Sequence, residues 1–269
     1  MCRSTARSSR STTNIEPTLR LIQFSDTHLL ARPQDELRGV RTLQSLRACV
    51  DRARAWHFPA AALLLSGDLV QDEPAGYAAI RATVAGLGIP VLVIPGNHDL
   101  PDRLQQSLAG PPFQVGGTFQ LGQWLVVLLS SWYAESAGGE GRLGGDELAG
   151  LDAALRRHAP HPALVCLHHP AVAMDSAGID ALGLTDVDAL REVLDRHDCV
   201  RGVTWGHAHQ ALDVYRGARR FMCAPSTCVQ FRPRAPRIEV DDRPPGYRVI
   251  DLHADGSLAS EVVWLEDCA

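Results

Sequence analysis

The sequence predicts an α/β fold, and three observations carry that prediction. Of its 269 residues, 45% are apolar, which is ordinary for a chain that buries a core and excludes disorder as the dominant state. Strand-sized apolar runs alternate with stretches of helical period, a pattern that favours a layered α/β architecture over an all-α or all-β one. Polar clusters follow directly after five of the strand-sized runs, where open α/β sheets place their ligand sites.

Predicted strands and helices alternate along the chain up to Gly206. Apolar runs of strand length predict strands at Leu19–Phe24, Ala61–Ser66, Pro90–Ile94, Trp124–Ser130, Pro162–Leu167 and Val200–Thr204. The intervening stretches place apolar residues at i, i+3, i+4 and i+7, the spacing of one helix face. This spacing predicts helices at Val40–Trp56, Ala75–Leu87, Asp146–His158 and Asp186–His197.

Beyond Gly206 the helical period disappears. Short strands are predicted at Leu212–Tyr215, Arg220–Cys223, Tyr247–Leu252 and Leu258–Trp264, so we expect the chain to close with a β-rich layer. Residues 231–246, FRPRAPRIEVDDRPPG, contain too much proline for a helix or a central strand. We predict a surface loop there.

The start of the chain differs from the rest. Its first eighteen residues are rich in Arg, Ser and Thr and lack the apolar stretch of a secretory signal. We therefore interpret residues 1–18 as a disordered extension and residues 19–269 as a single domain, expected in the cytoplasm. Apolar runs such as Ala60–Leu65 are far shorter than the roughly 18–20 residues of a membrane span, so we expect no membrane partner.

Charge and cysteine usage exclude further classes of protein. The 26 basic and 31 acidic residues give a net charge of −5, and no basic stripe is present to neutralise a phosphate backbone. We therefore expect no nucleic-acid partner. The 7 cysteines are odd in number and form no CxxC pair, which argues against a disulfide framework and against a structural zinc site.

Five short polar motifs, each at the end of a predicted strand, concentrate the nitrogen and oxygen donors of the chain. They are Asp26-Thr27-His28, Gly67-Asp68, Gly96-Asn97-His98-Asp99, His168-His169-Pro170 and Gly206-His207-Ala208-His209. Singly, an Asp or Asn after a strand is most often a turn former or helix cap, and a lone histidine is more often structural than a ligand. Together, at one sheet edge, they predict a metal site.

The number of donors exceeds the four of a tetrahedral structural zinc site. It indicates two metal ions that share a bridging carboxylate, for which Asp68 is the natural candidate because it has two oxygens. Two adjacent cations lower the pKa of a bridging water and clamp a phosphoryl group during in-line attack, so the site suits phosphoester hydrolysis. Nitrogen and oxygen ligands without thiolate suit Mn, Fe, Zn or Co.

In this order the five motifs resemble those of the calcineurin-like metallophosphoesterases. The segments SDTHLLA at 25–31, SGDLVQD at 66–72, GHAHQALD at 206–213 and PSTCVQFRP at 225–233 are similar to the bacterial class III 3′,5′-cyclic-AMP phosphodiesterases. The likeness extends from Leu19 to the C-terminus. It implies a four-layer α/β/β/α sandwich, the metallo-dependent phosphatase fold, with two metal ions, most often iron or manganese, and a homodimer.

The resemblance also implies a role for each motif residue. The first metal would be held by Asp26, His28, Asp68 and His209, and the second by Asp68, Asn97, His168 and His207. The His-x-Pro spacing selects His168 as the ligand and leaves His169 beside it. His98 would face the phosphate, where it would stabilise charge or protonate the leaving oxygen. Asp99 would orient an imidazole or, equally, only brace the loop.

The activity implied is hydrolysis of 3′,5′-cyclic AMP to 5′-AMP by a metal-bridging hydroxide, which would lower cyclic-AMP signalling. Asp68 and His98 would be catalytic, and the substrate would meet His28, Asp68, Asn97, His98 and His209. The alternative is a broader metallophosphodiesterase that acts on 2′,3′-cyclic nucleotides or other phosphodiesters. A catalytically silent metalloprotein is disfavoured because no ligand position in the five motifs is substituted.

A segment outside the motifs bears on the substrate. Phe231, at the end of Pro225–Pro233, would either stack on a nucleobase or belong to the core at a sheet edge. Nearby arginines would either attract an anionic nucleotide or form a solvated basic face. These are Arg219, Arg220, Arg232, Arg234 and Arg237.

Overall fold

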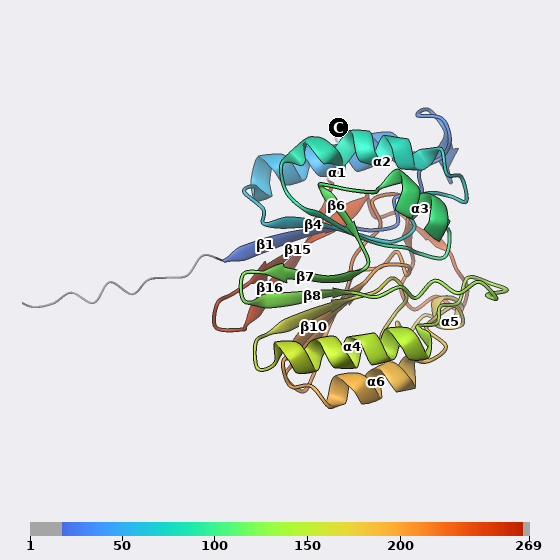
Figure 1. The fold of residues 1–269 in the computed structure, drawn as a ribbon. Helices are drawn as coiled ribbons and strands as arrows, with labels where there is room; N and C mark the ends of the chain where they lie inside the picture. Colours follow the sequence, from blue (N-terminus) through green and yellow to red (C-terminus); the bar gives the residue numbers. More distant parts are fainter. Residues whose placement is uncertain (1–17, 266–269) are drawn as a thin grey trace, which may run out of the picture.

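Two six-stranded sheets pack face to face, with helices on both outer faces, in a computed structural model that describes residues 18–265 (Figure 1). Helices α1, α2 and α3 cover the first sheet, and α4 and α6 cover the second (Figure 1). The predicted four-layer α/β/β/α sandwich is therefore confirmed.

The first sheet has the strand order β16-β15-β1-β4-β5-β6. Strands β1, β4, β5 and β6 run parallel, and β15 and β16 add an antiparallel edge beside β1. The bounds are β1 Leu19–Phe24, β4 Ala62–Ser66, β5 Val91–Ile94, β6 Phe113–Val115, β15 Gly246–Leu252 and β16 Leu258–Trp264.

The second sheet has the order β11-β12-β10-β9-β8-β7. Its four inner strands are parallel, and β7 and β11 close it on either side as antiparallel edges. The bounds are β7 Gly117–Leu121, β8 Trp124–Leu128, β9 Ala163–Cys166, β10 Val200–Trp205, β11 Leu212–Arg216 and β12 Arg219–Cys223. The parallel strands β4, β5, β8 and β9 are buried along their whole length, which explains why they are almost entirely apolar.

The helices follow the predicted apolar stripes, and short elements fill the connections. The helices are α1 Thr42–His57, α2 Gly76–Val84, α3 Pro101–Ser107, α4 Gly144–His158, α5 Ala177–Asp180 and α6 Val187–Asp195, with a 3-10 turn η1 at Ala85–Leu87. Two small hairpins complete the structure, β2 Glu36–Leu37 with β3 Val40–Arg41, and β13 Gln230–Phe231 with β14 Val240–Asp241.

The period of two in each strand divides the core into three layers. In β1, Leu21 faces the second sheet while its neighbour Ile22 packs beneath α1. The inter-sheet layer centres on Trp124, which is fully buried and donates its indole N–H to the His253 carbonyl at 2.9 Å. Each large apolar side chain buried this way contributes about 1.5–3 kcal/mol, so the sheets are held together mainly by apolar contact.

Two buried polar side chains join the sheets. Gln23 on β1 donates to Ser66 Oγ at 2.9 Å and to the Trp205 carbonyl at 3.1 Å, and it accepts from Thr204 Oγ1 at 2.6 Å. Arg248 on β15, fully buried, donates to the Cys223 carbonyl at 2.8 Å across the interface. Because these groups are satisfied only when the sheets are docked, they fix how one sheet lies on the other.

Most predicted elements are present, with ends shifted by a few residues, and two expectations need correction. The strands after Gly206 do not form a layer of their own, because β11 and β12 extend the second sheet while β15 and β16 extend the first. The Pro-rich segment 231–246 is partly regular, since β13 pairs with β14 there. The extension expected at residues 1–18 lies almost wholly outside the described residues and stays a prediction, as does the single domain over 19–269.

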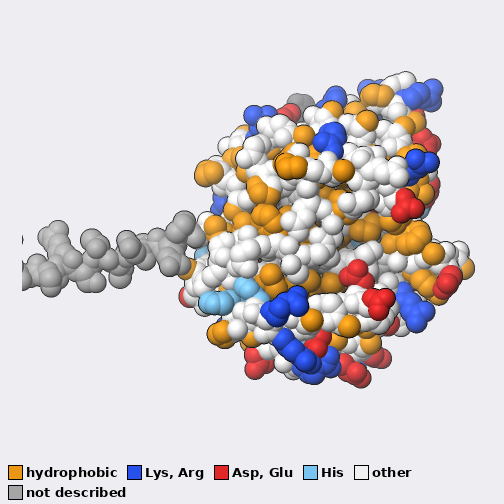
Figure 2. Space-filling view, in the orientation of Figure 1, with side chains coloured by type: hydrophobic (Ala, Val, Ile, Leu, Met, Phe, Trp, Pro, Cys, Tyr) orange, Lys and Arg blue, Asp and Glu red, His pale blue; other side chains and the backbone are white. Residues whose placement is uncertain are grey.

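The surface carries both signs of charge. Figure 2 shows Lys/Arg and Asp/Glu side chains interspersed over α4 and α6, in keeping with the modest net charge of −5. Within residues 18–265, no helix is both long and apolar enough to cross a membrane.

Candidate metal centre

The five polar motifs converge where the strands of both sheets end. Three of them follow β1, β4 and β5 of the first sheet, and two follow β9 and β10 of the second. Backbone bonds join them, from Asp26 N–H to the Gly67 carbonyl at 3.0 Å and from Gly206 N–H to the His168 carbonyl at 3.1 Å. The sequence predicted that the motifs would meet at one edge of a sheet. In the structure they meet where the strands of two stacked sheets end.

Strained backbone concentrates at this end. Asp26, His28, Asp68, His207 and His209 all lie in the left-handed region, with φ of 53°, 44°, 51°, 61° and 48°. Residues with a Cβ avoid this region at a cost of about 1–3 kcal/mol each, so five examples in one cluster must be held by the surrounding structure. Such strain is typical of functional sites, and here it points the side chains toward one another.

Glycine allows the motif loops to approach closely. A Cβ on Gly206 would lie 2.7 Å from Asp26 Oδ2 and would collide with Ser25 Oγ. A Cβ on Gly96 would collide with Asp68 and lie 2.8 Å from His168 Cε1. The glycines of the Gly-Asn-His-Asp and Gly-His-Ala-His motifs therefore make room for donor side chains of the neighbouring loops.

Asp26, His28 and His209 form the first donor group. The Nε2 atoms of His28 and His209 lie 3.0 Å apart, and His209 Nε2 lies 3.5 Å from Asp26 Oδ1. Because His209 Nδ1 donates to the Val229 carbonyl at 2.7 Å, its Nε2 carries a lone pair and no proton. Two nitrogens bound to one ion at about 2.1 Å are themselves about 3 Å apart, so this spacing fits shared coordination.

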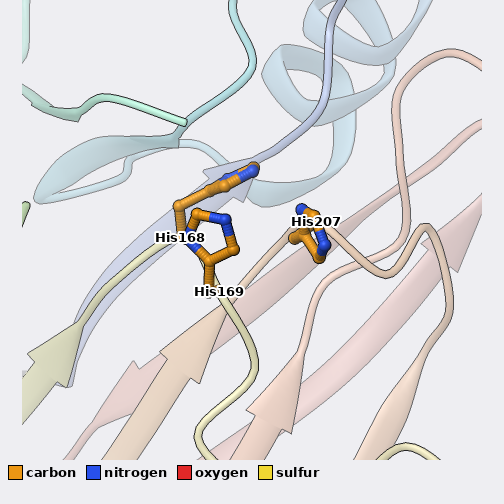
Figure 3. Close-up of side chains that lie close together, drawn as sticks. All are labelled: His168, His169 and His207. Carbon is orange, nitrogen blue, oxygen red and sulfur yellow. The ribbon is translucent and has the colours of Figure 1, made fainter. Parts of the chain in front are cut away.

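His168, Asn97 and His207 form the second donor group. His168 Nδ1 donates to the Ser66 carbonyl at 2.8 Å, which directs its Nε2 into the site. Asn97 Oδ1 lies 2.9 Å from His207 Nδ1 and 3.3 Å from His168 Nε2. Figure 3 shows the His207 ring facing the consecutive His168 and His169, with centroid separations of 5.2 and 4.6 Å.

Asp68 lies between the two donor groups. Its Oδ1 is 3.4 Å from His168 Nε2, and its Oδ2 is 3.7 Å from His28 Nε2. Burial alone would raise the pKa of this carboxyl, but the facing His168 and His28 imidazoles hold it well below its usual range. One carboxylate therefore offers one oxygen to each group, as a bridging ligand must.

His169 differs from its neighbour. Its Nδ1 accepts from Ser131 Oγ at 2.8 Å, and its Nε2 donates to the Gly139 carbonyl at 3.0 Å. Both ring nitrogens are thus engaged by protein groups, whereas His168 keeps Nε2 for the site. His168, His169 and His207 place ring nitrogens within 4.8 Å of one another, so the choice of His168 over His169 stays a prediction, which these bonds support.

The electrostatics of the cluster suit cations. Burial lowers the pKa of His28 to about 4 and holds the pKa values of His207 and His209 well below their usual range, so all three imidazoles are neutral donors at pH 7. Burial also opposes charge on His168, yet the Asp68 and Asp26 carboxylates raise its pKa to about 9. The proton on His168 places a positive charge beside the buried Asp68 and Asp26 carboxylates. Bound metal cations would supply that positive charge instead. The donor set therefore fits a dimetal site.

His98 and Asp99 take different places. The His98 ring is about one third exposed, lines the cleft above Asp68 and has Nδ1 3.1 Å from the Asp72 carboxylate. Asp99 is buried and accepts from Gly96 N–H and Tyr77 Oη, both at 2.9 Å. Its recorded side-chain bonds include no imidazole within the described residues. Of the two roles considered for Asp99, the contacts therefore favour bracing the loop.

A cleft of about 220 Å³ opens above the donors. We call the donor residues the floor: Asp26, His28, Asp68, Asn97, His168, His207 and His209. Of these, Asp26 and His168 are fully buried and do not line the cleft itself. We call the residues that face the floor across the cleft its roof: Leu37, Arg38, Ile179, Leu182, Phe231 and Ile238. The roof comes from the two small hairpins and the region of α5, none of which the sequence patterns predicted.

The place of Phe231 combines the two positions considered for it, while stacking on a nucleobase stays a prediction. It is half-buried against the core of the second sheet, and it also lines the cleft with its ring stacked on His209 at a centroid distance of 4.4 Å. The five arginines considered as nucleotide attractors do not line the cleft. Arg220, for example, pairs with Asp213 at 2.7 Å. Arg38 lines it instead, and only the Arg38-Gly39 turn signal in the sequence marks its position.

Comparisons with known proteins agree with this geometry. The profile of the calcineurin-like phosphoesterase family matches residues 19–211. The chain is 34% identical to the 3′,5′-cyclic adenosine monophosphate phosphodiesterase CpdA of Vibrio vulnificus, over 92% of this chain and 90% of that one. It is 32% identical to CpdA of Escherichia coli K12, over 94% and 92%.

Among solved structures, a dimetal phosphatase of Danio rerio superposes with a TM-score of 0.65 at 13% identity, covering 93% of this chain and all of that one. This likeness concerns the fold. The two bacterial relatives match nearly the whole chain in sequence, and the profile matches the part from residue 19 to residue 211. The chain belongs to the calcineurin-like phosphoesterase family.

Proposed function

We propose that this protein hydrolyses 3′,5′-cyclic AMP to 5′-AMP with two metal ions bound at the floor of the cleft. The observation that supports it most is the arrangement of Asp68, whose two oxygens face His28 of one donor group and His168 of the other. The first ion would be held by Asp26, His28, Asp68 and His209, and the second by Asp68, Asn97, His168 and His207.

Metal ions bound there would supply positive charge for the phosphoryl oxygens and lower the pKa of a water for attack on phosphorus. The chain itself would orient the substrate. Asn97 and His98 both line the cleft, where an amide N–H and a ring N–H can donate to a phosphoryl oxygen. His98 Nδ1 is held near Asp72, which leaves Nε2 to pass a proton to the departing 3′ oxygen.

The cleft supports a nucleotide as the substrate. Its floor is polar, whereas its roof is largely apolar and ends in one guanidinium, that of Arg38. A cyclic nucleotide has the same division, with an anionic phosphodiester at one end and a planar base at the other. The relatives named CpdA support cyclic AMP in particular. The alternative remains a broader phosphodiesterase, because the floor alone would accept many phosphodiesters.

Iron or manganese is our proposal for the metals, because nitrogen and oxygen donors of this kind suit both and none of the described donor groups includes a cysteine. We also keep the expectations of a homodimer and of a place in the cytoplasm, where the substrate would be found.

A substrate panel tests the proposal. The purified protein should release 5′-AMP from 3′,5′-cyclic AMP, and 3′,5′-cyclic GMP, 2′,3′-cyclic AMP and bis(p-nitrophenyl) phosphate should be the comparison substrates. Metal analysis of the same preparation should give two ions per chain. If cyclic AMP is the poorest of the four substrates, the proposal is wrong and the broader activity takes its place.

A further inference from the structure

The tip of the hairpin β2–β3 places an arginine at the mouth of the cleft in an unfavourable conformation. Arg38 and Gly39 form the two-residue turn, with φ of 50° and 83°. A turn with two positive φ values favours Asn or Asp at its first position and Gly at its second. Arg38 occupies the first position at a cost in backbone strain, which draws attention to what its side chain does.

The Arg38 side chain reaches the ring that covers a candidate metal ligand. Its guanidinium carbon lies 5.6 Å from the centroid of Phe231, within the range of a cation–π contact. The Phe231 ring also stacks on His209, with the rings only 16° from parallel. His209, Phe231 and Arg38 therefore form a stack that rises from the floor to the roof.

The Phe231 ring already packs against His209 and Arg38 of the protein itself, whereas the guanidinium of Arg38 is open to a base. It is exposed, and within residues 18–265 it forms no recorded ion pair or side-chain hydrogen bond, whereas Arg41 of the same hairpin pairs with Glu36 at 3.1 Å. Among the described residues that line the cleft, Arg38 is also the single Lys or Arg.

These features match the chemistry of a purine. A guanidinium plane stacks on the face of a base, and its N–H groups reach the acceptor atoms of a purine edge. The neighbouring roof side chains Leu37 and Ile238 are apolar and would cover the remaining faces. The distance along the stack also separates Arg38 from the floor, where the phosphodiester would be bound.

We propose that Arg38 is a specificity-determining residue that contacts the base of the cyclic nucleotide, and that Phe231 is a positioning residue that holds Arg38 over the cleft. The inference rests on the proposed function, because it assumes a nucleotide substrate with its phosphodiester at the floor. It assigns recognition of the base to a side chain that lies outside all five motifs.

The test compares substrates with and without a base. Arg38→Ala should raise KM for cyclic AMP about tenfold, the size expected for loss of one stacking contact, and leave kcat/KM for bis(p-nitrophenyl) phosphate unchanged. Arg38→Lys should recover little, because an ammonium cannot stack as a plane. Phe231→Leu should act in the same direction with a smaller effect. Arg232→Ala is the matched control, because Arg232 is exposed on the other hairpin, pairs with Glu239 and does not line the cleft.

Equilibrium titration with 5′-AMP gives a readout that does not depend on turnover. The affinity of Arg38→Ala should fall about tenfold, and that of Arg232→Ala should not change. Equal loss on both substrates in Arg38→Ala, or unchanged affinity for 5′-AMP, would overturn the role of Arg38. A wild-type protein that cleaves bis(p-nitrophenyl) phosphate but not cyclic AMP would instead refute the proposed function, and the titration would still decide whether Arg38 binds a nucleotide.

Discussion

The floor and the roof of the cleft are built in different ways. The floor consists of side chains at the ends of two sheets, all buried except the half-buried Asn97, and several of them lie on strained backbone. The roof consists of two hairpins whose strands have two residues each and a helix of four residues, and two of its side chains, Arg38 and Ile238, are exposed. The floor depends on the whole fold, whereas the roof depends on local turns.

We therefore expect the floor to determine metal binding and catalysis, and the roof to determine which substrate is preferred. A change in the floor alters the donor set and the packing of both sheets, so we expect it to affect metal content, turnover and stability together. A change in the roof meets solvent on one side and few buried partners, so we expect it to alter the preference among substrates and little else. The following substitutions test that division.

The largest effect is expected from Asp68→Asn. The substitution keeps the size of the side chain but removes the charge that faces both donor groups, so metal binding and activity should fall together, activity by on the order of a thousandfold. Metal analysis and the release of 5′-AMP check it. A variant that kept two ions and a tenth of its activity would show that Asp68 does not bridge.

His98→Ala should separate turnover from metal binding. The ring lines the cleft but belongs to neither donor group as we assign them, so kcat should fall about a hundredfold or more through loss of proton transfer and charge stabilisation, with metal content unchanged. Metal analysis beside steady-state kinetics distinguishes the outcomes. Loss of metal in this variant would place His98 among the ligands.

Gly206→Ala should reveal how closely the floor is packed. The added methyl group would meet Ser25 and Asp26, so the free energy of unfolding should fall by about 1–3 kcal/mol. Gly150→Ala is the control, because Gly150 is exposed in α4 with open space around its Cα and should gain up to about 1 kcal/mol. Urea unfolding of the metal-free proteins measures both. Equal stability of the two variants would contradict close packing at Gly206.

The smallest effect is expected from Ile238→Ser in the roof. The side chain is 38% exposed, so the free energy of unfolding should change by less than about 0.5 kcal/mol. KM for cyclic AMP should rise about two- to fivefold through loss of apolar contact with the nucleoside, while kcat stays the same. A marked loss of stability would show that the roof is coupled to the fold after all.

The difference between the floor and the roof also explains which parts of the structure could be predicted from the sequence. Strands β1 and β16 were predicted with both ends as observed, because long apolar runs and their period depend only on the residues themselves. Donor residues of the floor were recognisable because coordination needs particular side chains at short spacings. The motif resemblance specified their order, and the contacts described above bring all of them together.

The roof could not be predicted in this way. Two-residue strands such as β13 and β14 have no measurable period, and the four residues of α5 barely exceed one helical turn. Helix α3 did carry a signal, since Pro101 is its first residue, but it buries only Leu104. Arg38 lies close to Phe231 because of tertiary folding, across nearly two hundred residues of chain.

The left-handed backbone conformations of the floor residues could not be predicted from the sequence either. Asp68 and His207 adopt them because hydrogen bonds from neighbouring loops outweigh their own preference, as when His207 N–H donates to Asp26 Oδ1 at 3.0 Å. Histidine gives no local sign of positive φ comparable to that of glycine.

The buried Gln23 side chain bears on how metal binding affects the stability of the fold. Two of its three bonds cross the sheet interface, to Trp205 and Thr204 on β10, and the third joins β1 to β4 within the first sheet. Both sheets also contribute to the donor groups that follow the ends of these strands. Metal ions can then bind tightly only while the sheets are docked, so by linkage every tenfold excess of metal over its Kd adds about 1.4 kcal/mol to the work of separating them. Metal ions bound at the proposed centre would therefore also stabilise the packing of the two sheets, and loss of the metals would weaken it.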